Sequence, residues 1–212
     1  MKNKSKEASV LNRTIIAIAG GGFSQHIPAY IDEYIINQAR SDGAVKICFI
    51  PTASNDAQGY IDRFYEAFAH CDASHVTQDK LASPSMQAIL NEQDVLYVGG
   101  GNTQFMLKMW REAGFDALLI NAYQQGTVLA GISAGAMCWF DMCLCEKEDG
   151  NFEEVQGLGL LAGTFCPHYQ EPARKEAFDK WQTEAVIQPS YALTDDETLH
   201  FRNEEVLVKL TT

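Results

Sequence analysis

The sequence predicts an α/β fold, a three-layer sandwich in which helices cover both faces of a mostly parallel sheet. Short, nearly continuous runs of Val, Ile and Leu alternate along the chain with segments of helical periodicity. Continuous apolar runs are typical of parallel strands, because both faces of such a sheet are buried. Three of these runs end in Gly-rich turns or at Pro. Sites in open α/β sheets form at such carboxyl ends of strands, so this edge is where we expect function.

In the first half of the chain, predicted strands alternate with predicted helices. The strands are residues 14–19 before Gly20-Gly21-Gly22, residues 45–50 before Pro51, a short run at 75–77, and residues 95–98 before Gly99-Gly100-Gly101. The helices are residues 27–39, 60–69, 85–90, 105–111 and 115–124. In the second helix, Tyr60, Phe64 and Phe68 recur every four residues and therefore share one face.

The second half begins with a predicted strand at residues 126–130, a sharp turn and an apolar segment at 136–140 that reads as a helix. The rest is less regular, with short strands predicted at 163–169, 191–193 and 198–201. Residues 206–210 are predicted to pair with the last of these as a hairpin. We expect residues 1–12 to be a flexible tail and residues 13–212 to form one domain, because a chain of 212 residues suits a single hydrophobic core.

Composition excludes several classes of partner. The formal net charge is −12, from 16 Lys and Arg against 28 Asp and Glu, which argues against nucleic acid and anionic membranes. No apolar stretch is long enough to span a membrane, and the basic N-terminus lacks the apolar region of a signal peptide. The six Cys residues show neither a C-x-x-C pair nor a metal-ligand spacing. We therefore expect reduced thiols, a cytoplasmic protein and no metal.

The stretch Gly131-Ile132-Ser133-Ala134-Gly135 is the strongest functional signal. The pattern G-x-S-x-G between an apolar strand and a helix is typical of a nucleophile elbow, in which a strained turn exposes the Ser hydroxyl. The amide of Ala134 would then lie at the start of a helix, where backbone N–H groups are unpaired and can bind an anion. The alternative is an ordinary strand-to-helix turn that contains Ser.

A nucleophilic Ser needs a base and donors for the oxyanion. Of the five His residues, His168 is the best candidate for the base, because it follows a short strand broken by Pro167; the others are His26, His70, His75 and His200. The Gly99–Gly101 turn offers backbone amides without obstructing side chains, although it could also be a loop that needs positive φ. Gly20-Gly21-Gly22 does not complete a dinucleotide-binding fingerprint, since Gln25 stands where the third Gly would be.

Three blocks together resemble the signature of the peptidase E family of serine peptidases, to which cyanophycinase is distantly similar. They are Val98–Thr103, Gly131–Ala136 and Pro167-His168, and the similarity covers most of the chain. The resemblance implies a fold like that of class I glutamine amidotransferases, with Ser in place of their Cys, and no metal or cofactor. It implies Ser133 as nucleophile, His168 as base, and Gly101 and Ala134 as oxyanion donors.

The resemblance also implies an acidic residue near the start of a late strand that orients the His. We expect Asp196 in this role, with Asp195 nearly as suitable; a Ser–His dyad with a weak third member is the alternative. A second acidic candidate is Glu148, for which a solvated charged loop is the favoured interpretation. Preference for an N-terminal Asp would require cations, and Arg174 and Arg202 are the candidates. The residues Asn102, Tyr169 and Gln170 are further candidates for lining the substrate site.

The sequence thus predicts an enzyme: a cytoplasmic serine-dependent dipeptidase or exopeptidase that acts near a free N-terminus, with Asp-X peptides as the preferred substrates. We expect a small peptide as partner, and a monomer or homodimer. The alternatives are an isopeptide or ester hydrolase of the same family, and a binding or regulatory protein that kept the fold without catalysis. A glutamine amidotransferase would need Cys at the elbow, and Cys138 lies too late in the chain.

Overall fold

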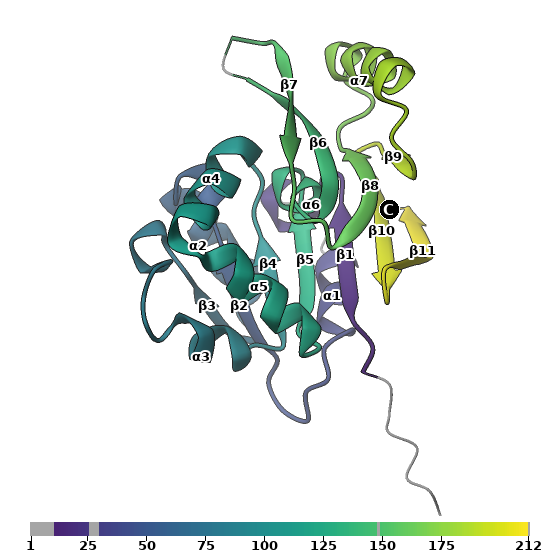
Figure 1. Ribbon diagram of the computed structural model, residues 1–212. Helices are drawn as coiled ribbons and strands as arrows, with labels where there is room; N and C mark the ends of the chain where they lie inside the picture. Colours follow the sequence, from purple (N-terminus) through teal and green to yellow (C-terminus); the bar gives the residue numbers. More distant parts are fainter. Residues whose placement is uncertain (1–10, 26–29, 148, 212) are drawn as a thin grey trace, which may run out of the picture.

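The computed structural model describes residues 11–25, 30–147 and 149–211 of the chain. Its central element is a seven-stranded sheet of order β11-β10-β1-β5-β4-β2-β3 (Figure 1). These strands are β1 Thr14–Ile18, β2 Lys46–Ile50, β3 Asp72–His75, β4 Val95–Val98, β5 Val128–Ile132, β10 Glu197–Arg202 and β11 Glu205–Thr211. Strands β1, β5, β4, β2 and β3, which are neighbours in this order, run parallel to one another. Strands β10 and β11 are antiparallel to their neighbours.

Helices pack on both faces of this sheet and bury alternate residues of its strands. These helices are α1 Tyr30–Ile36, α2 Gln58–Ala67, α3 Met86–Asn91, α4 Thr103–Ala113, α5 Phe115–Gln124 and α6 Ala134–Met137, whereas α7 Pro172–Ala185 buries Phe178 and Trp181 in a separate apolar cluster. Side chains of α1 and α2 form one apolar cluster with strand residues such as Ile16 and Phe49. Side chains of α3, α4 and α5 form another with neighbouring strand residues such as Ile15 and Cys48. The predicted α/β fold with a mostly parallel central sheet is confirmed.

A second sheet was not predicted from the sequence. It has four strands in the order β7-β6-β8-β9, namely β6 Phe140–Glu146, β7 Phe152–Gln156, β8 Leu161–Cys166 and β9 Ser190–Ala192. The predicted helix at residues 136–140 is wrong, because α6 ends at Met137 and β6 begins three residues later. Periodicity does not separate a buried helix from a buried strand in a short apolar run, and no turn residue marks this boundary. Helix α7 was also missed.

The C-terminal hairpin is confirmed and has a consequence for the site. Strand β10 pairs with β11 and also, in antiparallel fashion, with β1, so that Ile18 lies opposite Thr198. The start of β10 therefore reaches the same edge of the sheet as the carboxyl end of β1. The segment 194–196 that precedes β10 is delivered to the edge where the Gly-rich turns and Ser133 lie.

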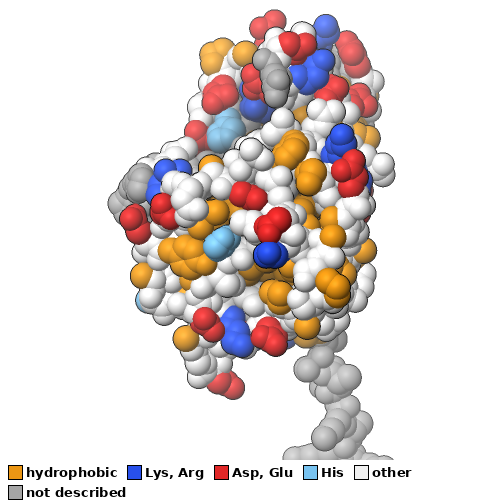
Figure 2. Space-filling view, turned by 90° about the vertical axis from the view of Figure 1, so that its left-hand side faces the viewer, with side chains coloured by type: hydrophobic (Ala, Val, Ile, Leu, Met, Phe, Trp, Pro, Cys, Tyr) orange, Lys and Arg blue, Asp and Glu red, His pale blue; other side chains and the backbone are white. Residues whose placement is uncertain are grey.

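The surface combines charges of both signs. On the face seen in Figure 2, acidic and basic side chains are interspersed with apolar ones. Within the described ranges, no helix has the length and apolar character needed to cross a membrane. All six cysteines are free thiols, and all but Cys71 are buried.

Candidate active site

Ser133 occupies a strained turn between β5 and α6. Its backbone has φ 53° and ψ −113°, a conformation that L-residues rarely adopt and that persists only when the surroundings hold it. The Ser133 amide donates to the Ile18 carbonyl at 2.9 Å, and its own carbonyl accepts from the Ala136 and Met137 amides, each at 2.9 Å. The strand–turn–helix geometry predicted for this motif is therefore present.

The glycines of the motif are required by close backbone packing. A Cβ atom at Gly131 would overlap the carbonyl of Gly135, and one at Gly135 would overlap the carbonyl of Val98 on the neighbouring strand. The turn is thus pressed against β4 as well as against its own helix. Larger residues at either position would displace the Ser133 backbone.

His168 faces Ser133 from the second sheet. It follows β8 and Pro167, and its Nε2 lies 2.8 Å from Ser133 Oγ. The imidazole is held by the backbone around it, since the His168 carbonyl accepts from the Glu171 amide at 2.9 Å and the Tyr169 amide donates to the Leu193 carbonyl at 3.0 Å. About a fifth of the His168 side chain is exposed, so a ligand approaching Ser133 can also reach the ring.

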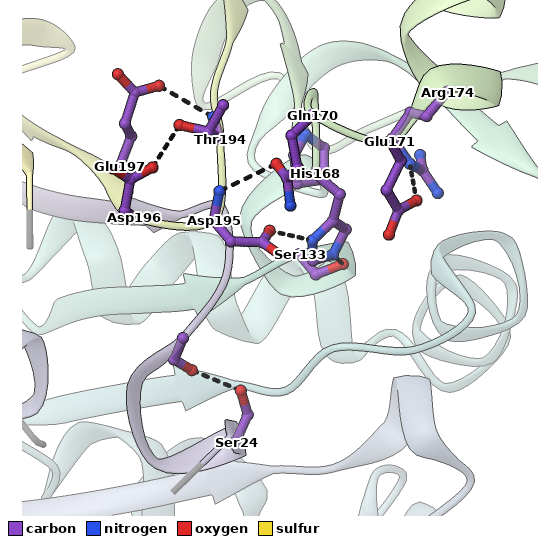
Figure 3. A network of polar contacts seen from close by, with 12 residues as sticks. Ser24, Ser133, His168, Gln170, Glu171, Arg174, Thr194, Asp195, Asp196 and Glu197 are labelled. Atoms are coloured by element: carbon purple, nitrogen blue, oxygen red, sulfur yellow. Dashed lines mark hydrogen bonds and ion pairs between the residues drawn. The ribbon is translucent and has the colours of Figure 1, made fainter. Parts of the chain in front are cut away.

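The carboxylate that contacts the imidazole belongs to Asp195, whose Oδ1 is hydrogen-bonded to His168 Nδ1 (Figure 3). Gly20, two residues after β1, makes room for this carboxylate, because a Cβ there would overlap it. The Asp195 amide donates to Gln170 Oε1 at 3.2 Å. Gln170, two residues after His168, thereby ties the acidic segment to the loop that carries the imidazole.

The prediction that Asp196 contacts the imidazole is wrong. The Asp196 carboxylate accepts a hydrogen bond from the Thr194 hydroxyl, which lowers its pKa, and lies away from the ring in Figure 3. Thr194 and Glu197 close a turn before β10 through two hydrogen bonds, from the Thr194 amide to Glu197 Oε2 at 3.0 Å and from the Glu197 amide to the Thr194 carbonyl at 2.9 Å. This turn directs adjacent side chains to different sides. The other acidic candidate, Glu148, lies outside the described residues.

The two predicted oxyanion donors line the same edge. Gly101 has φ 140°, and a Cβ there would overlap the Ala53 carbonyl. The amides on either side are engaged, Gly100 with the Tyr60 hydroxyl at 3.3 Å and Asn102 with the Ala53 carbonyl at 2.8 Å. The Gly101 amide donates to no described residue, and the same holds for the Ala134 amide at the start of α6.

Two cavities meet at Ser133. The Arg174 cavity has a volume of about 290 Å³ and is lined by Gly101, Asn102, Thr103, Ser133, Met137, Cys145, Glu146, Lys147 and Arg174. The Arg63 cavity has a volume of about 240 Å³ and is lined by Gly20, Ser24, Gln25, Tyr60, Arg63, Gly100, Ile132, Ser133 and His168. Both are small, below the usual range for drug-sized ligands, so each suits about one amino-acid residue.

Arg174 is well placed in its cavity. Its guanidinium donates to Glu146 at 3.1 Å and lies 5.6 Å from the centre of the Phe152 ring, with 13% of the side chain exposed. Lys147 and Glu146 add one charge of each sign to the lining. Asn102 also lines this cavity, and its side chain accepts from the Phe105 amide at 2.9 Å, which caps helix α4.

Other predicted residues lie elsewhere. Arg202 lies opposite Thr14, at the amino end of β1, whereas Ser133 lies near the carboxyl end of this strand, so Arg202 is remote from Ser133. The Tyr169 hydroxyl donates to Asp179 and lines neither cavity. His200 is buried against the Tyr34 hydroxyl, and burial lowers its pKa to about 4. His26 lies outside the described residues.

Sequence reasoning missed Arg63 and Tyr60 as residues of the site. Tyr60 was predicted only to share one helix face with Phe64 and Phe68; its ring lies in the core, yet its hydroxyl reaches the Gly100 amide. Burial raises the pKa of Tyr60 to about 12, so this hydroxyl is neutral. Among the described residues, no group of three or more His, Cys, Asp or Glu side chains is arranged to hold a metal ion.

Comparison with known proteins places the chain in a family. The model of peptidase family S51 matches residues 15–209. The uncharacterized peptidase YgaJ of Bacillus subtilis is 42% identical over 198 residues, which cover 92% of this chain and 85% of the relative. Peptidase E of Streptomyces coelicolor is 28% identical, over 72% of this chain and 60% of the relative.

A solved structure supports the fold. The crystal structure of a putative peptidase E protein from Listeria monocytogenes EGD-e superposes with a TM-score of 0.69 at 21% identity, over 95% of this chain and 99% of the other. The family model and the curated relatives confirm the resemblance to the peptidase E family. The chain belongs to peptidase family S51 and is a serine-type peptidase.

Proposed function

We propose that Ser133 is the nucleophile of this peptidase, His168 its general base and Asp195 the residue that orients the imidazole. The observation that carries the proposal is the continuous chain of hydrogen bonds from Asp195 through His168 to Ser133, which ends at a hydroxyl on a strained turn. Nucleophile, base and orienting carboxylate in hydrogen-bond contact are the arrangement that acyl transfer requires. The three residues come from distant parts of the chain.

The geometry suits the following reaction. His168 Nε2 accepts the Ser133 proton while Oγ forms a bond to the carbonyl carbon of the peptide. When the C–N bond breaks, the imidazolium gives this proton to the leaving amine. A water molecule, deprotonated by His168, then attacks the acyl-enzyme and releases the carboxylic acid and the Ser133 hydroxyl. The ionised Asp195 carboxylate accepts a hydrogen bond from Nδ1–H, which keeps Nε2 free to act as base and stabilises the imidazolium.

In this reaction the amides of Gly101 and Ala134 stabilise the oxyanion. Both border the Ser133 turn, and neither is engaged with a described residue. The removal of one such donor typically costs about 10²–10³ in kcat. The positive φ of Gly101 is consistent with this role, because it lets the backbone approach the substrate without a side chain in between.

The Arg174 cavity suits the N-terminal residue of an Asp-X peptide. An N-terminal Asp carries an ammonium group and a carboxylate, and this cavity holds charges of both signs. We assign Glu146 to the substrate ammonium group, and Arg174 with Lys147 to the Asp carboxylate, since guanidinium groups bind carboxylates well. The preferred substrates would then be dipeptides or short peptides with Asp in first position.

The substitution Ser133→Ala tests the mechanism. We expect turnover of a susceptible peptide to fall on the order of 10⁶-fold in kcat, because the group that forms the acyl-enzyme is gone. Circular dichroism and thermal unfolding should match wild type, since only one oxygen is removed. A variant that retains most of its activity would refute Ser133 as nucleophile.

A panel of X-Ala dipeptides, with ester and isopeptide substrates alongside, tests the substrate class. We expect Asp-Ala to be cleaved with the highest kcat/KM and the isosteric Asn-Ala to be cleaved much more slowly, because it lacks the charge that Arg174 would bind. Faster cleavage of an ester or isopeptide would keep the mechanism and change the substrate. If folded protein fails to react with any acyl-serine probe, catalysis itself is excluded.

A further inference from the structure

The two cavities at Ser133 differ in which reacting groups they contain. His168 lines the Arg63 cavity and Gly101 lines the Arg174 cavity, while Ser133 lines both. On the mechanism proposed above, the imidazole must pass its proton to the leaving amine, so the leaving residue lies on the His168 side. The Arg63 cavity is therefore the place of the residue that follows the scissile bond.

Arg63 is held in this cavity by its own helix. It lies one turn after Tyr60 on α2, and its guanidinium carbon is 5.4 Å from the centre of the Tyr60 ring. Tyr60 is in turn fixed to the backbone of the Gly-rich turn, because its hydroxyl accepts from the Gly100 amide at 3.3 Å. The guanidinium thus has a defined position close to the turn that carries the proposed oxyanion donor.

The charge of Arg63 is uncompensated within the described part of the chain. It forms no ion pair with a described carboxylate, and its buried Nε has no hydrogen-bond partner. Among the described residues that line the Arg63 cavity there is no Asp or Glu, whereas the Arg174 cavity contains Glu146. A partly buried cation without a partner is costly, and a bound carboxylate would offset that cost.

We infer that Arg63 binds the free α-carboxylate of the leaving residue and so makes this enzyme selective for dipeptides. In a dipeptide the residue after the scissile bond ends in a carboxylate, which is the anion available on the His168 side. In a longer peptide that carboxylate is replaced by an amide, which lacks the charge, and the chain must extend further than the cavity of about 240 Å³. This inference rests on the proposed mechanism and adds the determinant of peptide length.

The test compares a dipeptide with its carboxamide, which differs only in the charge at the C-terminus. The first residue is whichever the panel shows to be cleaved best, so the outcome does not depend on a preference for Asp. For wild type we expect kcat/KM to be about 10- to 100-fold higher for the dipeptide than for the carboxamide, as for a hydrogen-bonded charged group. We expect a tripeptide to behave like the carboxamide.

The substitution Arg63→Met should lower kcat/KM for the dipeptide by about the same factor and leave the carboxamide almost unchanged. Arg63→Lys should retain part of the preference, because it keeps the charge without the two-pronged geometry. The matched control is Arg40→Met, which removes an equal charge at an exposed position outside both cavities. Equal losses on dipeptide and carboxamide would overturn the inference, as would a wild-type enzyme that cleaves both equally.

A binding measurement separates this inference from the mechanism. In the Ser133→Ala background, calorimetry should show tighter binding of the dipeptide than of the carboxamide, and Arg63→Met should abolish the difference. If wild type cleaves none of the peptides, the proposed mechanism fails while this measurement still decides the role of Arg63. Equal affinities for the two ligands in the Ser133→Ala protein would exclude carboxylate binding by Arg63.

Discussion

Asp195 and Asp196 are adjacent in the chain but lie in different surroundings. Asp195 contacts the His168 ring, and the space for it exists because residue 20 has no side chain. Asp196 instead accepts from the Thr194 hydroxyl, in the turn that precedes β10. The two carboxylates therefore form a matched pair, in which the chemistry is the same and only the position relative to the imidazole differs.

We expect Asp195→Asn to lower kcat by about 10⁴, because an amide at this position favours the wrong imidazole tautomer and does not stabilise the imidazolium. Asp196→Asn should leave kcat close to the wild-type value. Steady-state kinetics on the best dipeptide measures both, with thermal unfolding as the control for folding. A larger loss in Asp196→Asn than in Asp195→Asn would contradict the assignment.

At the scale of elements, the position of Ser133 depends on how closely β5, α6 and β4 approach one another. Helix α6 is only four residues long, and the chain enters β6 soon after it. Because so short a helix gains little stability from its own hydrogen bonds, packing of the turn against β4 must hold Ser133 in place. Gly131 and Gly135 permit that packing.

The substitution Gly135→Ala tests this packing. Its Cβ would overlap the Val98 carbonyl, and we expect a loss of about 1–3 kcal/mol in the free energy of unfolding, together with reduced activity. The control is Gly59→Ala on α2, where a Cβ meets no atom within 4 Å. That change should cause no loss, with a gain of up to about 1 kcal/mol. Chemical denaturation compares the two, and equal stabilities would contradict the packing argument.

At the scale of the whole molecule, the candidate site exists only when both sheets are assembled. Ser133 follows a strand of the central sheet, His168 follows a strand of the second sheet, and Asp195 precedes the antiparallel strand β10. The hydrogen bond between the Asp195 amide and Gln170 joins two of these segments. Loss of activity should therefore coincide with unfolding of the whole domain rather than with unfolding of a single strand or helix.

The stability of the whole molecule should depend on pH through Asp32. This side chain is 2% exposed, and neither carboxyl oxygen has a hydrogen-bond partner among the described residues. Burial raises the pKa of Asp32 to about 7; the charge of Glu33 adds to the rise, and the nearby Phe23 amide offsets part of it. The buried hydroxyl of Tyr97 shares this environment, since Asp32 contributes to raising its pKa.

The direction of this pH dependence follows from proton binding. Between pH 4 and 7 the folded state holds a proton on Asp32 that the unfolded state has released, so wild type loses stability as pH rises through this window. Asp32→Asn should remove this loss and stabilise the protein at pH 8 relative to wild type by up to about 4 kcal/mol. Urea denaturation from pH 4 to 8 measures the free energy of unfolding of both proteins, with a substitution at an exposed position, Asp42→Asn, as control. Parallel curves for wild type and Asp32→Asn would contradict the prediction.

The amino-acid sequence by itself determined the parallel core of the fold and the turn that carries Ser133. Continuous apolar strands and the G-x-S-x-G pattern between a strand and a helix are local features of the sequence, and a local pattern suffices to predict them. His168 was also predicted, from its place after a strand and from the family resemblance.

Only the tertiary structure decided which carboxylate meets the imidazole, that residues 140–146 and 152–156 form strands, and that Arg63 borders Ser133. A shift of one residue in a turn reverses the direction of a side chain, and the sequence pattern around Asp195 and Asp196 is the same in either case. Arg63 is far from the other site residues in the chain, so its role follows from the packing of α2 on the sheet. Such choices depend on contacts between distant segments, and no local pattern records them.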